Sequence, residues 1–104
     1  MILMYVSLND SELAKEISTK ILERRLANHV NIVPKNTSYQ WIDNQIVISE
    51  EVVLWIKTKA LLYADIERLI NNEYAELDPK MFSVPVTQID FRYYDFLKEG
   101  TMKV

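Results

Sequence analysis

Metal binding is the first chemistry to consider, because the sequence has a single histidine, His29, and no cysteine. Imidazole is a common ligand of copper and zinc, whereas the thiolates that favour copper(I) are absent. One imidazole per chain cannot form a tight site, so a metal would need a carboxylate as a second ligand, or three His29 side chains on a threefold axis. A structural or exposed histidine at the start of a strand is the simpler interpretation. We expect any binding to be weak and to follow protonation near the ordinary pKa of ~6.5, with Asn31 as the nearest polar companion.

An acidic group in the second half of the chain offers a different kind of site. Glu73, Glu76 and Asp78 are close together in the sequence, and carboxylate oxygens are the ligands that Mg²⁺ and Ca²⁺ prefer. Solvated loop charge explains the same residues more simply, and we favour that interpretation.

Three aromatic residues have the chemistry of a small-molecule cleft. The rings of Tyr39, Trp41 and Trp55 carry polar atoms at their edges, which suits the wall of a binding site. Packing between subunits explains them with fewer assumptions. We therefore expect them in an interface between copies of the chain, with a cleft as the alternative.

The sequence lacks the motifs of common enzyme classes. It has no Gly-x-Ser-x-Gly turn, no phosphate-binding glycine loop and no zinc-protease helix, and its single glycine excludes most backbone anion nests. Glu50 and Glu51 are adjacent, so in a strand their carboxylates point to opposite faces and cannot act on one substrate. We expect a protein that is not an enzyme and requires no cofactor.

Length and charge narrow the setting in which these residues act. The 104 residues, 49% of them hydrophobic, fit one domain spanning residues 1–104. A formal net charge of -3 without a segment of clustered Lys and Arg argues against nucleic acid as a partner. No apolar run approaches the ~20 residues of a membrane span, and the apolar start has no basic leader. We expect no membrane partner and a cytoplasmic location.

The first third of the chain reads as a strand followed by a helix. Met1–Leu8 is apolar on both alternating faces, which is typical of a central strand. Asn9 followed by Glu12 has the pattern of a capping box, which predicts a helix start. Apolar residues then recur at spacings of three to five, and this amphipathic pattern ends near Asn28.

The middle of the chain reads as a long hairpin. His29–Trp41 is rich in β-favouring residues and is interrupted at Pro34, which predicts one strand with a bend. Asp43–Asn44 is a plausible tight turn because both residues tolerate positive φ. Gln45–Thr58 then forms the second strand. Both strands are far longer than the usual ~5–6 residues.

The last part of the chain completes a recognisable order of elements. Leu62–Ile70 predicts a second amphipathic helix ended by Asn71–Asn72, Pro79–Val86 predicts a last strand, and Tyr93–Leu97 predicts a short terminal helix. The order strand, helix, strand, strand, helix, strand predicts an α+β, ferredoxin-like split βαβ sandwich with a long hairpin.

This architecture leaves apolar surface without a cover. Two helices cover one face of the sheet, yet the strands Met1–Leu8 and Val52–Ile56 are apolar on both faces. The projecting hairpin would also expose Tyr39 and Trp41. A soluble monomer rarely tolerates so much apolar surface, so we predict a homotrimer.

Five segments resemble, in order, motifs of the CutA divalent-cation-tolerance family. In this chain they read ERRLANHVNIVP after the first helix, SYQW, EVVLWIKT and FSVPV in the strands, and YYDFL in the terminal helix. The segments are Glu23–Pro34, Ser38–Trp41, Glu51–Thr58, Phe82–Val86 and Tyr93–Leu97. The resemblance covers nearly the whole chain.

The resemblance implies a ferredoxin-like fold, a tight homotrimer with hairpins wrapping between subunits, and a role in tolerance or homeostasis of divalent cations such as copper, with weak metal binding at most. The resemblance also implies that five residues lie in a trimer interface or cleft: Tyr39, Trp41, Trp55, Lys57 and Tyr93. The alternative is a trimeric signalling or scaffold module, similar in architecture to the PII proteins, that binds a small molecule or protein at intersubunit clefts.

Three departures from the family pattern concern polar residues. His29 stands where members commonly have a cysteine associated with copper. Tyr74–Leu77 replaces a His-Pro-Tyr-Glu segment, and the hairpin turn Ile42–Gln45 is one residue longer than the usual turn. These differences bear on metal binding more than on architecture.

Overall fold

The computed structural model describes residues 1–104 and has an antiparallel four-stranded sheet with three α-helices. The strand order is β2-β3-β1-β4, so β1 lies inside the sheet, as a strand apolar on both faces predicts. The ferredoxin-like arrangement is confirmed. The elements are β1 (Ile2–Leu8), α1 (Ser11–Glu23), β2 (His29–Ile42), β3 (Gln45–Thr58), η1 (Ala60–Leu62), α2 (Tyr63–Glu73), η2 (Ala75–Leu77), β4 (Lys80–Pro85) and α3 (Phe91–Gly100).

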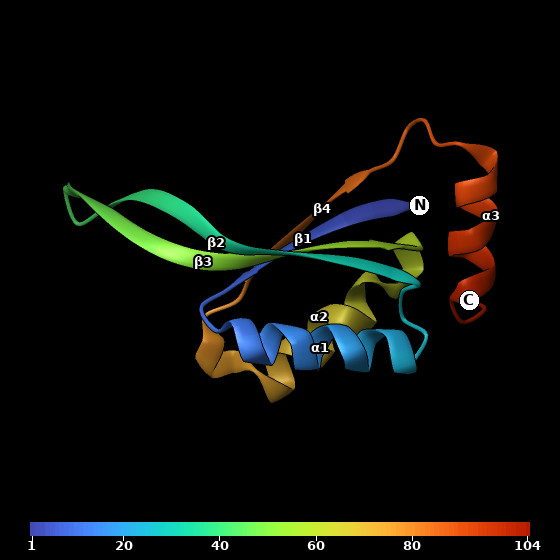
Figure 1. The fold of residues 1–104 in the computed structure, drawn as a ribbon, viewed down its shortest axis with the longest axis horizontal. Helices are drawn as coiled ribbons and strands as arrows, with labels where there is room; N and C mark the ends of the chain where they lie inside the picture. Colours follow the sequence, from blue (N-terminus) through green and yellow to red (C-terminus); the bar gives the residue numbers. More distant parts are fainter.

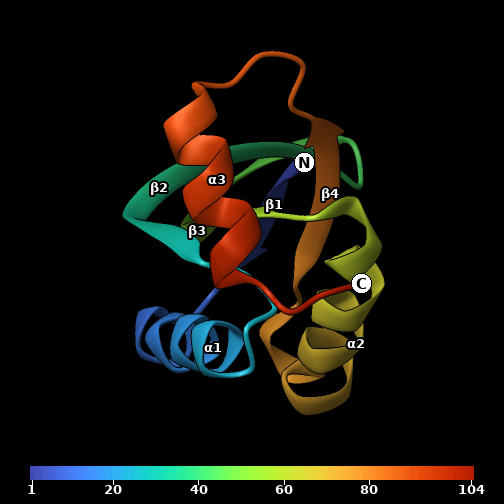
Figure 2. The ribbon, with the colours of Figure 1, turned by 90° about the vertical axis from the view of Figure 1, so that its right-hand side faces the viewer.

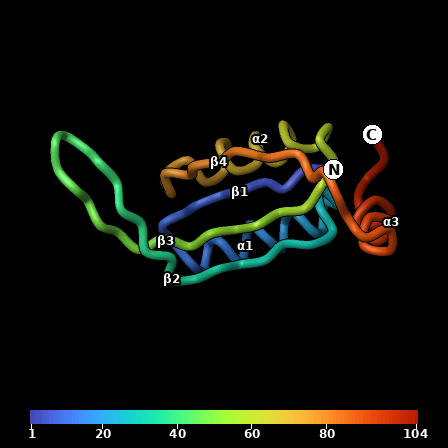
Figure 3. The backbone as a smooth tube through the Cα atoms, turned by 90° about the horizontal axis from the view of Figure 1, so that it is seen from above, coloured from blue at the N-terminus to red at the C-terminus, as the bar shows by residue number.

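The helices form a layer on one side of the sheet only. Figure 1 shows α1 and α2 beneath the strands, Figure 2 shows the two helices side by side, and Figure 3 shows the opposite face of the sheet open. The third helix, α3, stands across one end of the sheet, at the opposite end of the molecule from the β2–β3 turn (Figures 1 and 2).

The hydrophobic core fills the space between the sheet and the two helices. Alternate residues of the central strand, Met4, Val6 and Leu8, point into it and are buried. Burial of each such side chain contributes roughly 1.5–3 kcal/mol to stability. The residues that α1, η1 and α2 contribute to this core are Ala14, Ile17, Ile21, Leu62, Ile66, Leu69 and Ile70.

Helix α1 begins one residue later than the capping-box pattern indicates. The N-cap is Asp10, whose side-chain oxygen accepts hydrogen bonds from the backbone N–H groups of Glu12 and Leu13. Asn9 as the capping residue was therefore wrong. An aspartate at the N-cap also places a negative charge at the positive end of the helix dipole, so it satisfies two physical demands at one position.

The same helix ends well before Asn28. Arg25 adopts a left-handed conformation with φ 58°, and its N–H donates to the carbonyl of Leu22, while the N–H of Leu26 donates to the carbonyl of Ile21. These two bonds form a Schellman motif, which ends a helix without glycine here. Leu26 still packs in the core, which explains why the apolar spacing continues past the helix end.

The other two helices are longer than expected. Helix α2 continues through Asn71–Asn72 to Glu73, and the buried ring of Tyr74 follows it into the core. Helix α3 begins at Phe91, because the Asp90 carboxylate caps it by accepting from the N–H groups of Arg92 and Tyr93. The aromatic motif alone indicated only the middle of this helix.

The β2–β3 hairpin has the predicted turn and bend. Asp43 and Asn44 have φ 51° and 61°, the positive values that a two-residue type I′ turn requires. The register between the strands shifts between Val33 and Asn36, where β2 holds one extra residue, and Lys35 within this bulge has φ 53°. Beyond the bulge the hairpin extends past the helices (Figure 3).

The capping geometry predicts that alanine substitutions at two neighbouring residues change the stability of the protein by different amounts. Asp10→Ala should lower the free energy of unfolding by about 1 kcal/mol, because the N–H groups of Glu12 and Leu13 lose their acceptor. Asn9→Ala, the matched control, should change it by much less. Urea unfolding followed by circular dichroism measures both; equal effects would contradict Asp10 as the cap.

Candidate functional site

A row of aromatic rings crosses the open face of the sheet. Tyr5 on β1 lies between Trp55 on β3 and Phe82 on β4, because these three residues are paired across the strands. The ring centroids of Tyr5 and Trp55 are 5.2 Å apart in an edge-on arrangement, and those of Tyr5 and Phe82 are 4.7 Å apart and stacked. Such pairs contribute about 0.5–1.5 kcal/mol each beyond burial. Phe82 remains half exposed.

His29 lies at the start of β2 on the same face, where it contacts helix α3. Its Nδ1 atom is 2.6 Å from the hydroxyl oxygen of Tyr93, and the two rings meet edge to face with centroids 5.8 Å apart. This contact joins residues 64 positions apart in the chain. Tyr93, and not Asn31, is therefore the nearest polar companion of His29.

Helix α3 is held in place by the connection that precedes β2. The Asn28 side chain donates to the carbonyl of Phe96, and the N–H of Met102 donates to the carbonyl of Arg25. Gly100 faces Asn28 so closely that an added Cβ would lie 2.0 Å from the Asn28 side chain. The only glycine of the chain thus permits the approach that positions Tyr93 against His29.

Lys57 sets the electrostatic environment of this corner. It is paired with His29 across the strands, and its ammonium donates a hydrogen bond to the side-chain oxygen of Asn31. Burial, and secondly the charge of Lys57, lower the pKa of His29 below its ordinary value. Burial also lowers the pKa of Lys57 and raises the pKa of the Tyr93 phenol. The pKa of His29 thus lies below the ordinary value that the sequence alone led us to expect.

The hydrogen bond between His29 and Tyr93 determines which ring nitrogen is free. If Nδ1 carries the proton and donates to the Tyr93 oxygen, the lone pair of Nε2 is available to a metal. If the Tyr93 hydroxyl donates to Nδ1, the proton sits on Nε2 and that atom cannot bind one. A lowered histidine pKa keeps the ring neutral at pH 7, which ligation requires.

The aromatic residues of the hairpin lie apart from this corner. Trp41 is paired with Ile46 and Tyr39 with Ile48, so the four side chains share one face of the hairpin. Their exposed fractions are 71%, 63%, 70% and 59% in that order. Along β3 this face is that of the even-numbered residues, whereas Trp55 faces the other way. Within one chain, Tyr39 and Trp41 therefore do not form a cleft with Trp55.

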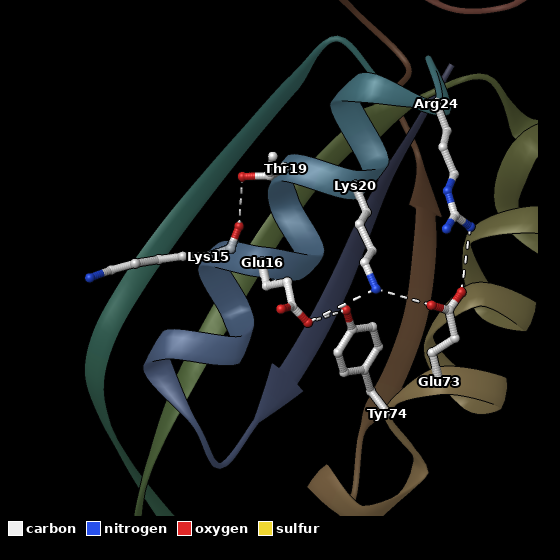
Figure 4. A network of polar contacts seen from close by, with 7 residues as sticks. All are labelled: Lys15, Glu16, Thr19, Lys20, Arg24, Glu73 and Tyr74. Carbon is white, nitrogen blue, oxygen red and sulfur yellow. Dashed lines mark hydrogen bonds and ion pairs between the residues drawn. The ribbon is translucent and has the colours of Figure 1, made fainter.

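Two of the three acidic residues, Glu73 and Asp78, pair with cations, and the three do not gather around a common centre. Glu73 accepts from Lys20 at 3.0 Å and pairs with Arg24 at 3.5 Å, so its pKa is lowered, chiefly by the Lys20 hydrogen bond. The Tyr74 hydroxyl donates to Glu16 at 2.5 Å (Figure 4).

Asp78 pairs with Lys80 at 3.5 Å, and Lys80 also pairs with Glu51 at 3.6 Å. No group of three or more His, Asp or Glu side chains with metal-binding geometry exists in the chain. Glu73 and Asp78 thus take part in ion pairs, and the two pairs of Glu73 join the end of α2 to α1 and its C-cap. Glu76 is exposed and forms no ion pair.

Comparison with known proteins identifies the fold and the family together. A sequence model described as "CutA1 divalent ion tolerance protein" matches residues 2–100. The chain belongs to the CutA1 family. Its relatives include the divalent-cation tolerance protein CutA of Thermus thermophilus, 29% identical over 97 residues that make up 92% of this chain and 93% of that protein. Protein CutA of Homo sapiens is 30% identical over 96% of this chain but only 56% of its own length.

Solved CutA1 structures have the same architecture. CutA1 from Oryza sativa aligns with a TM-score of 0.90 and 26% identity over 99% of this chain and 94% of the rice chain. The Thermus thermophilus protein aligns with a TM-score of 0.88 over 98% of this chain and all of that chain. No observation on the structure or its relatives favours the PII-like alternative.

The sequence patterns did not identify Tyr5 and Phe82, two residues of the open face, as site residues. Both lie at alternate positions of apolar strands, and the cross-strand register that aligns them with Trp55 appears only once β1 is placed between β3 and β4. Their signal was the apolar second face of Met1–Leu8. That pattern indicated a covered face but not its aromatic character.

The environment of His29 predicts a measurable shift on removal of Lys57. Lys57→Met should raise the pKa of His29, because the repelling ammonium is lost while burial remains; Lys15→Met, far from the ring, should leave it unchanged. NMR titration of the histidine ring measures both. An unchanged or lowered pKa in Lys57→Met would contradict the electrostatic cause.

Because the pKa of His29 is lower in the folded than in the unfolded state, the unfolded chain binds the proton more readily. The contribution of His29 to stability is therefore present above the unfolded value of ~6.5 and is lost as the pH falls toward the folded value.

Proposed function

We propose that this protein serves in divalent-cation tolerance as a homotrimer that binds cations weakly and catalyses no reaction. Family membership supports the cation role, since its relatives are named divalent-cation tolerance proteins and not enzymes. The single structural observation that carries the assembly is the apolar surface left uncovered on the open sheet face and on the hairpin.

Both uncovered surfaces are apolar, so each can pack against an apolar surface of another copy. The hairpin face of Tyr39, Trp41, Ile46 and Ile48 projects beyond the helices of its own chain and has no cover there (Figure 3). The open sheet face likewise has no helix over its aromatic row. A closed ring of three copies buries both kinds of surface in each copy, whereas a monomer leaves them in water.

His29 supplies the one imidazole for a cation in this proposal. The proposal requires the tautomer in which Nδ1–H donates to the Tyr93 oxygen, so that Tyr93 holds the ring and leaves Nε2 to the cation, as the outer partner of a metal-bound histidine does. Lys57 works against cation binding because its ammonium lies near the ring. A site with one imidazole and a neighbouring positive charge is weak, unless other subunits bring further ligands.

A cytoplasmic location is part of the proposal. No helix of the chain has the length and apolar character to cross a membrane. The names of relatives place the Arabidopsis thaliana protein in the chloroplast and the Archaeoglobus fulgidus protein in the periplasm, so the family occurs in several compartments.

The assembly is tested by mass in solution. Light scattering should give about three times the chain mass of 12.3 kDa. Trp41→Ala should weaken the trimer by roughly 3–5 kcal/mol, the typical cost of truncating a buried aromatic ring. Leu61→Ala, which truncates an equally exposed apolar residue away from the hairpin, is the control. A monomer, or an equal effect of both variants, would refute the proposed interface.

Metal binding is tested by calorimetry with copper(II). Near pH 7 the binding should be weak and should vanish in His29→Ala, while Tyr93→Phe should weaken it because the ring loses its hydrogen-bond partner. Acidification below the folded-state pKa should abolish it, since protonated imidazole cannot ligate. Submicromolar binding that survives His29→Ala would place the site elsewhere.

A further inference from the structure

The chain has a net negative charge, but several of its positive side chains gather in one place. Of the 12 Lys and Arg side chains, five form ion pairs with carboxylates, namely Lys15, Lys20, Arg24, Arg68 and Lys80. Four of the remaining cations line a single cavity of about 390 Å³, and they are Arg25, Lys59, Lys98 and Lys103. We name these four residues the basic cluster. Glu99 is the only acidic residue of the lining.

The fold brings the basic cluster together from distant parts of the chain. Arg25 follows α1, Lys59 follows β3, and the two others belong to α3 and the segment after it, which runs back toward α2 (Figure 2). The Arg25 guanidinium donates to the carbonyl of Glu99 at 3.0 Å, and Lys59 donates to the carbonyl of Met102 at 2.8 Å.

Part of the basic cluster has a structural role, and part has none. The bonds of Arg25 and Lys59 anchor the segment after α3, but their acceptors are neutral carbonyls, so the positive charges remain uncompensated. Lys98 lies in the last turn of α3, where a cation favours the helix dipole. Lys103 makes no hydrogen bond or ion pair within the chain.

An apolar cavity adjoins the basic cluster. It has about 360 Å³ and shares Lys59 and Lys98 with the first cavity, and its other lining residues are Met1, Ala60, Leu61, Tyr94 and Val104. The Lys98 ammonium lies 5.9 Å from the centre of the Tyr94 ring. The volumes fall within the ~300–1,000 Å³ of typical small-molecule sites.

We propose that these adjoining cavities bind a small organic phosphate with an aromatic group, the chemistry of a nucleotide. Four cations with one opposing carboxylate call for a ligand with several negative charges, and a di- or triphosphate has them in a compact form. The Tyr94 ring and the exposed Leu61 side chain give the aromatic group a surface to pack on. This site lies within one chain and is separate from the His29 corner.

The test is calorimetric titration of the intact protein with ATP in buffer without divalent cations, so that cation binding does not contribute. ATP should bind with a Kd below about 100 μM, and inorganic pyrophosphate and adenosine should each bind at least about tenfold more weakly, because each fills only one cavity. The binding should weaken as salt rises.

Charge-reversal variants separate a site from general attraction. Lys98→Glu and Lys103→Glu should each weaken ATP binding about tenfold or more. The Lys103 side chain is exposed and has no partner within the chain, so its replacement removes no structural contact. Lys15→Glu changes the net charge equally on the far helix α1 and should have little effect. Tyr94→Leu should weaken the binding of ATP but not that of pyrophosphate.

Three results would overturn the proposal. They are no binding of ATP by the unaltered protein, equal losses in Lys15→Glu and the two cluster variants, and pyrophosphate binding as tight as that of ATP. None of them bears on the trimer or on copper binding, so this inference and the proposed function fail independently.

Discussion

Two helices cannot cover both faces of a four-stranded sheet, and much of this structure depends on that limit. The core forms where α1 and α2 meet the even-numbered residues of β1, and the odd-numbered residues are left on the open side. The open side is nevertheless apolar, with Trp55, Tyr5 and Phe82 in a row. The architecture of one chain thus creates the surface that the proposed trimer requires.

The departures from the family pattern have physical consequences in the structure. His29, where the resemblance implies a cysteine, bonds to Tyr93 and faces the charge of Lys57, an environment that favours neutral imidazole but repels a cation. In the segment Tyr74–Leu77, where the resemblance implies His-Pro-Tyr-Glu, the Tyr74 ring is buried and its hydroxyl bonds to Glu16 on α1. This chain uses the segment for packing.

The end of α3 is the place where the most distant parts of the sequence meet. Hydrogen bonds from Asn28 and Arg25 hold the helix, and Gly100 allows the close approach. The same docking places Tyr93 on His29 at one side and gathers the basic cluster at the other. A change that displaced α3 would consequently alter both corners at once.

Sequence periodicity was sufficient for the fold, because it reports local backbone geometry. The apolar character of both faces of Met1–Leu8, the Asp43–Asn44 turn and the interruption at Pro34 each predicted the structure found there. Helix ends were less accurate, since Asp10 and Arg25 act through backbone hydrogen bonds that residue spacing does not reveal.

The candidate sites needed the tertiary structure for a different reason. Residue types identified His29, and the family motif supplied Lys57 and Tyr93, but no local pattern shows that Tyr93 reaches His29 or that Arg25, Lys59, Lys98 and Lys103 share one cavity. The sequence by itself determined the elements, their order and the excess of apolar surface. Only the tertiary structure decided which polar groups meet, because such contacts depend on how α3 docks between segments far apart in the chain.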